Sequence, residues 1–204
     1  MSRDDTFIFI DTCSLLDSCW DCRGHGVGLR VTYSPNKEHT FWDVVLPSLA
    51  LIGEIVVTAR NYEELLRLMS VSDDGRPMLA ERCTYVLKRL RPLIDGKSVL
   101  IVGDPNDPFA DAILLSAALK FRTQKNLLFI TQDQALASDL ESISTFDSIR
   151  PRGYEMKVRR LSASGDIEAW RFMEGKKGAK ALRASAQQTP TPNVSASTSK
   201  EWWR

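Results

Sequence analysis

Short runs of aliphatic and aromatic residues alternate with segments of helical periodicity, and this alternation restricts the fold more than any other feature. Four runs have the length and β-branched content of strands, and a fifth is predicted to be an edge strand. They are residues 6–11, 54–58, 98–102 and 127–131, with the edge strand at 156–161. Strands that alternate with helices favour a parallel sheet covered on both faces. The sequence therefore predicts an α/β protein.

The segments between the runs are predicted to be helical wherever apolar residues recur at helical spacing. These helices are expected at residues 12–17, 40–52, 61–69, 78–94, 108–122 and 134–140. Residues 21–37 are rich in Gly, Arg and Asn and are predicted to form a loop or an extended excursion. We expect a main domain over residues 1–150, a C-terminal extension over 151–175 that includes a short helix from 166, and a disordered Ser/Thr/Pro-rich tail over 176–204.

The net charge of +1 conceals an acidic body over residues 1–149 and a basic segment over 150–204. Basic extensions commonly bind polyanions, of which nucleic acid is the most frequent, although a solvated charged tail explains the pattern as well. No apolar stretch approaches the ~20 residues that a bilayer span needs. The acidic N-terminus does not resemble a signal peptide, so we expect a cytoplasmic protein without a membrane partner.

Two aspartates lie at the ends of predicted strands. Asp11 directly follows the first strand, and Asp133 follows the strand at 127–131. The carboxyl ends of parallel strands form the ligand crevice of open α/β sheets. Aspartate is also a favoured N-cap, and a helix is expected after each of these residues. Both interpretations stay open for each residue taken alone.

Asp111 is predicted to lie inside a helix, on the mostly apolar face that it shares with Leu115 and Ala118. A buried carboxylate needs a partner, and Arg122 is three helical turns away. We therefore interpret Asp111 as a metal ligand. Asp107 precedes Pro108, the preferred type of first helical residue, so it is predicted to cap this helix. A supporting role for Asp107 at the metal site stays open.

Glu64 is the fourth acid that the predicted crevice could receive. It competes with a capping box, in which Glu64 would reach back to the backbone amide of Asn61. Four acids without a histidine at one sheet edge favour hard cations that take oxygen ligands. The sequence thus predicts a Mg²⁺ or Mn²⁺ site formed by Asp11, Glu64, Asp111 and Asp133.

The order of these motifs resembles the PIN-domain nucleases. The resemblance covers about residues 6–146. It is carried by the run from Asp11 to Leu16, by Glu64-Leu65, by the run from Asp111 to Leu114 with Ala117-Ala118, and by Ile130-Thr131-Gln132-Asp133. It implies a three-layer α/β/α sandwich with a short central parallel sheet and a metal-dependent ribonuclease site. The four acids would occupy the family's acidic positions, and the hydroxyl of Thr131 would support them.

The resemblance implies hydrolysis of RNA phosphodiester bonds, in which one or two bound ions activate water and neutralise charge on the phosphate. Basic residues of the extension, notably Lys157, Arg159 and Arg160, are expected to attract the RNA backbone. An antitoxin or another regulatory protein and a second copy of the chain are further partners that the resemblance suggests. A structure-specific DNA nuclease and a non-catalytic nucleic-acid-binding module are the alternatives.

Overall fold

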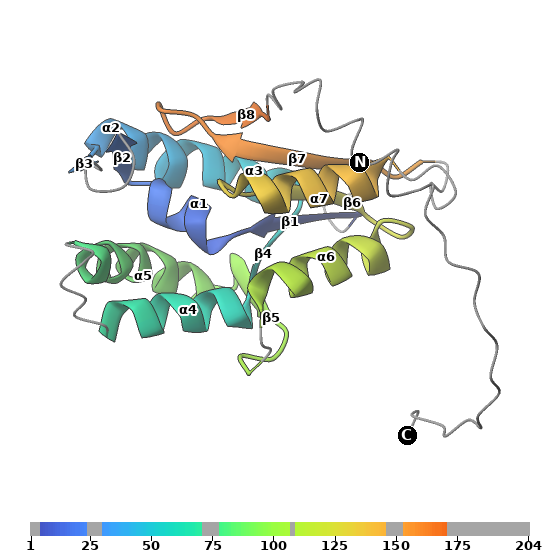
Figure 1. The fold of residues 1–204 in the computed structure, drawn as a ribbon, viewed down its shortest axis with the longest axis horizontal. Helices are drawn as coiled ribbons and strands as arrows, with labels where there is room; N and C mark the ends of the chain where they lie inside the picture. The colour runs from blue at the N-terminus through green and yellow to red at the C-terminus, as the bar shows by residue number, and fades with distance from the viewer. Residues whose placement is uncertain (1–4, 24–29, 71–77, 107–108, 146–152, 171–204) are drawn as a thin grey trace, which may run out of the picture. The chain divides into compact units, whose positions relative to one another are not determined.

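The computed structural model describes residues 5–23, 30–70, 78–106, 109–145 and 153–170. The predicted disordered tail at 176–204 and the predicted cap Asp107 lie outside these residues. Figure 1 shows a sheet with helices packed against it. The sheet has six strands in the order β5-β4-β1-β6-β7-β8. Their bounds are β1 (Thr6–Ile10), β4 (Glu54–Thr58), β5 (Val99–Val102), β6 (Asn126–Ile130), β7 (Met156–Leu161) and β8 (Ile167–Ala169).

All pairings from β5 to β7 are parallel, and only β8 is antiparallel to its neighbour. The predicted α/β class with a mainly parallel sheet is confirmed, and the predicted strands agree with the structure to within one residue at each end. Two predictions for the extension are wrong. β7 is not an edge strand, and residues 167–169 form β8 instead of a helix, because a turn at Gly165 folds them back onto β7. Gly165 has a φ of +94°, which favours glycine.

The helices occupy the connections between the strands, as predicted. Their bounds are α1 (Thr12–Asp17), α2 (Pro35–Glu38), α3 (Leu46–Ile52), α4 (Ala59–Ser70), α5 (Leu79–Asp95), α6 (Ala110–Phe121) and α7 (Gln134–Ser144). A π-helical segment, η3 (His39–Val45), continues directly into α3, and Pro47 lies in the first turn of α3. No helix in the described ranges is long and apolar enough to cross a membrane.

Residues 21–37 were predicted to be a loop or an extended excursion, and the strand pairing found there was not predicted. β2 (Trp20–Arg23) and β3 (Arg30–Tyr33) pair as a separate antiparallel ribbon, and α2 follows. Each strand is short and is paired with a second segment. The composition of one segment does not reveal where its partner lies in the chain. Trp20 packs against Tyr33 across the ribbon, and Tyr33 packs against Tyr85 of α5, which links the ribbon to the main body.

Alternating side chains of β1 point to opposite faces of the sheet. Ile8 and Ile10 are buried in the main core cluster with residues of α1, η3, α3, α4 and α5. On the other face, Phe7 packs edge-on against Phe121 of α6, and Phe9 stacks on Phe129 of β6. Helices therefore cover both faces of the sheet. The segments that leave the parallel strands meet at the edge of the sheet formed by the carboxyl ends of these strands.

Candidate acidic site at the carboxyl ends of the strands

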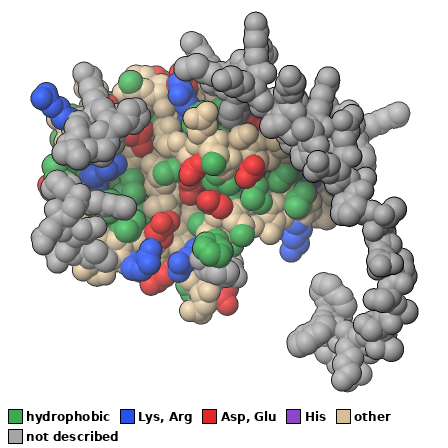
Figure 2. Space-filling view, in the orientation of Figure 1, with side chains coloured by type: hydrophobic (Ala, Val, Ile, Leu, Met, Phe, Trp, Pro, Cys, Tyr) green, Lys and Arg blue, Asp and Glu red, His purple; other side chains and the backbone are tan. Residues whose placement is uncertain are grey.

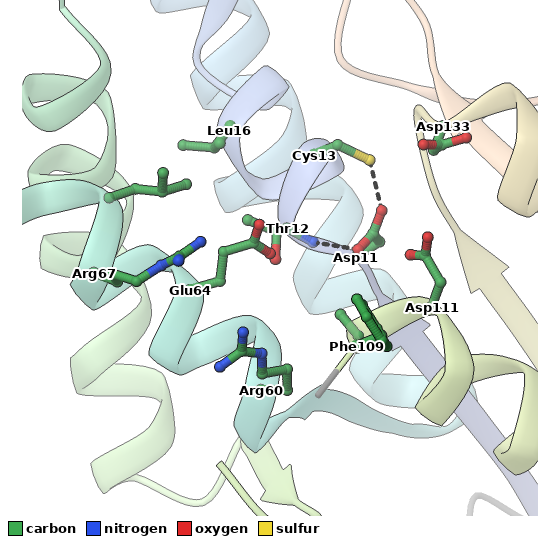
Figure 3. Close-up of a pocket in the computed structure, with 12 residues that line it drawn as sticks. Asp11, Thr12, Cys13, Leu16, Arg60, Glu64, Arg67, Phe109, Asp111 and Asp133 are labelled. Carbon is green, nitrogen blue, oxygen red and sulfur yellow. Dashed lines mark hydrogen bonds between the residues drawn. The ribbon is translucent and has the colours of Figure 1, made fainter. Parts of the chain in front are cut away.

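The strand order reverses its direction between β1 and β6. From β1 the chain moves outward to β4 and β5, and then returns to the other side of β1 with β6. Ligands of open α/β sheets bind at such a switch point, outside the carboxyl ends of the strands. A cavity of about 550 Å³ lies there (Figure 3). Its lining comprises Asp11, Thr12, Cys13, Leu16, Arg60, Glu64, Arg67, Leu68, Phe109, Ala110, Asp111 and Asp133.

All four acids predicted for the site thus line one cavity, and they come from four different places in the chain. Asp11 precedes α1, Glu64 belongs to α4, Asp111 to α6, and Asp133 precedes α7. Figure 2 shows acidic side chains gathered near the centre of this face of the molecule. Only the tertiary fold can bring together acids that lie up to about 120 positions apart, as Asp11 and Asp133 do.

Asp11 both caps a helix and lies in the cavity, so the two sequence interpretations are compatible. Its Oδ1 accepts hydrogen bonds from the backbone N–H of Thr12 at 2.8 Å and from Nδ2 of Asn61 at 3.2 Å. Its Oδ2 accepts from the hydroxyl of Thr131 at 3.0 Å and from the thiol of Cys13 at 2.6 Å. The side chain is only 7% exposed. Burial raises the pKa of Asp11 despite these hydrogen bonds, and Glu64 raises it further.

Asp111 does not lie on a buried helix face, and that prediction is wrong. The helix begins at Ala110, with Phe109 as its N-cap, so Asp111 falls in the first turn and its side chain is exposed. The buried stripe of α6 continues below it through Leu114 and Ala118. Partial desolvation raises the pKa of Asp111, and the charges of Asp11, Asp133 and Glu64 raise it further. Asp111 therefore faces like charges.

Glu64 does not form the predicted capping box. The backbone N–H of Asn61 donates to the hydroxyl of Thr58 at 3.1 Å, and that hydroxyl donates to Oδ1 of Asn61 at 2.8 Å. Because Thr58 satisfies the amide that Glu64 was predicted to reach, Glu64 is not needed as a cap. Its half-buried side chain lines the cavity instead.

Asp133 is the N-cap of α7, and its Oδ1 accepts from the backbone N–H groups of Ala135 and Leu136 at 2.7 and 3.0 Å. Thr131, which is 1% exposed, connects the two strand-end acids. Its hydroxyl donates to Asp11 and accepts the backbone N–H of Asp133 at 3.0 Å. The side chain of Thr131 thus holds both acids in position from the end of β6.

Cys13 is a cavity residue that sequence reasoning missed as part of the site. Besides donating to Asp11, its sulfur accepts the backbone N–H of Gln132 at 3.1 Å. This contact ties the start of α1 to the segment after β6. Burial raises the pKa of the Cys13 thiol, and the charge of Asp11 raises it further, so the thiol stays protonated at neutral pH. The hydroxyl of Thr12, also in the lining, is buried without a hydrogen-bond partner among the residues that the structure describes.

Arg60 and Arg67 are the cationic residues of the cavity, and they too were missed. Both belong to α4 and flank Glu64 (Figure 3). Positions 60, 64 and 67 are spaced i, i+4 and i+7, so they lie on one helix face, which the sequence could have revealed. In the part of the chain that the structure describes, neither guanidinium forms an ion pair.

The basic residues predicted to attract nucleic acid lie elsewhere. Lys157, Arg159 and Arg160 belong to β7, and none of the three lines the cavity. Lys157 pairs with Glu155 at 2.5 Å, and Arg160 pairs with Glu168 of β8 at 2.7 Å. Arg159 donates to the backbone carbonyl of Val158 at 2.9 Å. Two of these charges are therefore partly neutralised within the fold.

The donor set of the cavity fits a hard divalent cation in its chemistry. Carboxylate and hydroxyl oxygens are the ligands of Mg²⁺ and Mn²⁺. A cation would also relieve the mutual repulsion that raises the pKa of Asp111. As the side chains stand, no three His, Cys, Asp or Glu residues among those described are arranged to hold an ion. The residues therefore fit the ion by type, and their side chains would need to move to bind it.

Comparisons with protein-family models, with curated proteins and with solved structures found no match to this chain.

Proposed function

We propose that this protein is a metal-dependent ribonuclease of the PIN type. The observation that carries the proposal is the convergence of Asp11, Glu64, Asp111 and Asp133 on one cavity at the topological switch point. Carboxylates that repel one another are costly to hold together, so their placement is better explained by a cationic ligand than by stability. The sequence resemblance to PIN-domain nucleases supports the same assignment.

Asp11 and Asp111 would hold the principal Mg²⁺ or Mn²⁺ ion, and Asp133 and Glu64 would complete its surroundings. When bound, the ion supplies Lewis-acid activation of water and charge neutralisation at the phosphate. The protein's own residues would orient the metal ligands and offset the charge of the cavity. Thr131 and Cys13 orient Asp11 through their hydrogen bonds, while Arg60 and Arg67 offset the negative charge that the acids would present to RNA.

A non-catalytic nucleic-acid-binding module is the second candidate. It is favoured by the exposed position of Asp111 and by the lack of a ligating group of three side chains in the described residues. Such a module would bind RNA without cleaving it, and its acids would not need to be intact. The two candidates therefore differ in whether the protein hydrolyses RNA in a way that depends on Asp111.

The test is cleavage of a mixture of RNA and single-stranded DNA, with and without Mn²⁺, by the wild type and by Asp111→Asn. We expect Mn²⁺-dependent cleavage of RNA by the wild type, and a loss of more than about 100-fold in the variant, because even outer-shell residues of metal sites cost about 10–100-fold. Asp95→Asn is the matched control, an exposed acid at the end of α5 outside the cavity. Equal cleavage by all three proteins would refute the assignment.

A further inference from the structure

Phe109 has a position that the core does not explain. It is the N-cap residue of α6, and its side chain is 70% exposed. Single exposed apolar residues are common, so exposure alone carries no conclusion. However, Phe109 also lines the acidic cavity, on the α6 side together with Asp111 (Figure 3). An exposed aromatic ring therefore borders a cavity that four acids and two arginines also line.

Arg60 and Arg67 provide the second part of the argument. They line the same cavity from α4, and neither forms an ion pair within the described residues, although Glu64 lies between them in the chain. Their backbone positions are about 10 Å apart along the helix axis. Unpaired guanidinium groups bind phosphate oxygens through a planar pair of N–H donors. The α4 side of the cavity thus offers two phosphate contacts beside the acids.

We propose that Phe109, Arg60 and Arg67 form a subsite for a single-stranded nucleic acid, in which an unpaired base stacks on Phe109 and the arginines bind the adjoining phosphates. The inference rests on the proposed nuclease function and deepens it by naming residues that would hold the substrate beside the acids. Aromatic rings bind nucleic acids by stacking on bases that are free of a duplex. The subsite therefore selects an unpaired segment and places its backbone next to the four carboxylates.

The experiment measures binding of a fluorescein-labelled 12-nucleotide RNA and of the same sequence in a duplex, by fluorescence anisotropy. The full-length chain is used in EDTA, and gels check that the RNA stays intact. We expect Phe109→Ala to weaken binding of the single strand roughly 5- to 150-fold, which is the range for one stacked base. Binding of the duplex should stay unchanged. Phe109→Trp should retain the affinity and Phe109→Leu should lose it, because only the former keeps a stacking ring.

The matched control for Phe109 is Leu119→Ala on the same helix, which is 49% exposed and does not line the cavity. For the arginines, Arg60→Gln and Arg67→Gln should each reduce the salt dependence of single-strand binding by about 0.7 in log–log slope. Arg91→Gln, an exposed residue of α5, should leave it unchanged.

Equal affinities of Phe109→Ala and Leu119→Ala for the single strand, or equal losses with single strand and duplex, would overturn the subsite. Binding needs no hydrolysis, so this failure is distinct from that of the nuclease proposal. A protein that cleaves RNA but binds it independently of Phe109 refutes only the subsite. One that binds as expected but never cleaves refutes only the nuclease.

Discussion

The two sides of the cavity are built differently. On the side formed by the strand ends, Asp11, Thr131 and Asp133 are joined to each other and to helix starts by hydrogen bonds. On the side formed by α4 and the start of α6, the charges of Arg60, Arg67 and Asp111 have no ion-pair partner among the described residues. The first side contributes to folding as well as to the site. The charged side chains of the second side do not stabilise the fold through ion pairs with the described residues.

The largest difference between the two sides should appear at Asp11. Replacing Asp11 by Ala removes the acceptor for donors of Thr12, Cys13, Thr131 and Asn61 in a buried position. We expect the free energy of unfolding to fall by about 1–3 kcal/mol, through the lost cap and the unsatisfied donors. Urea denaturation at pH 7 measures it. Asp11→Asn is the control and should stay closer to the wild type, since Asn also caps helices. If Asp11→Ala left the midpoint and slope of the urea transition unchanged, the strand-end side of the cavity would not contribute to folding stability.

At Asp111 we expect the opposite behaviour. The side chain is exposed and faces the like charges of Asp11, Asp133 and Glu64. Asp111→Asn should leave the free energy of unfolding within ~0.5 kcal/mol of the wild type or slightly higher, although we expect it to lose cleavage. We expect Mn²⁺ to raise the melting temperature of the wild type, because ligand binding to the folded state stabilises it, and Asp111→Asn should diminish this rise. Thermal denaturation over a Mn²⁺ titration tests both points, and a destabilised Asp111→Asn would argue against them.

The smallest expected effect concerns how the free energy of unfolding depends on pH in the absence of metal. The pKa values of Asp11 and Asp111 lie above the ordinary 3.8 because of burial and neighbouring acids. The folded state therefore binds protons more tightly than the unfolded chain, so ionisation lowers the free energy of unfolding as the pH rises from 3.8 through the folded-state pKa values. The double variant D11N/D111N has no carboxyl group at these two positions, so its free energy of unfolding should not fall in this way. Its stability relative to the wild type should increase over that window and then level off, as denaturation in EDTA would show. A difference that is constant with pH would contradict this.

Local signals in the sequence were sufficient for the five parallel strands and for the caps formed by Asp11 and Asp133. The run at residues 54–58 matches β4, because β-branched residues bounded by Gly53 leave few alternatives. Asp11 and Asp133 were recognised both as caps and as strand-end acids, and the structure places them in both positions. These features depend on a few neighbouring residues, so a single sequence contains the information.

Asp111 shows where local reasoning failed. Its helix was expected from residue 108, which would have put Asp111 a full turn inside, but the helix begins at Ala110 and the carboxylate is exposed. Helix boundaries are uncertain from sequence by a residue or more, and one turn decides whether a side chain is buried. The residue was found, but the burial argument for it was wrong.

The sequence by itself determined the α/β class, the five parallel strands and the four candidate acids, because periodicity, cap preferences and motif order are local properties. Only the tertiary structure decided that these acids share a cavity with Arg60, Arg67 and Phe109, and that Lys157, Arg159 and Arg160 lie outside it. Which side chains meet depends on strand order and on how α4 and α6 pack at the sheet edge. Those are long-range contacts, and their partners are distant in the chain.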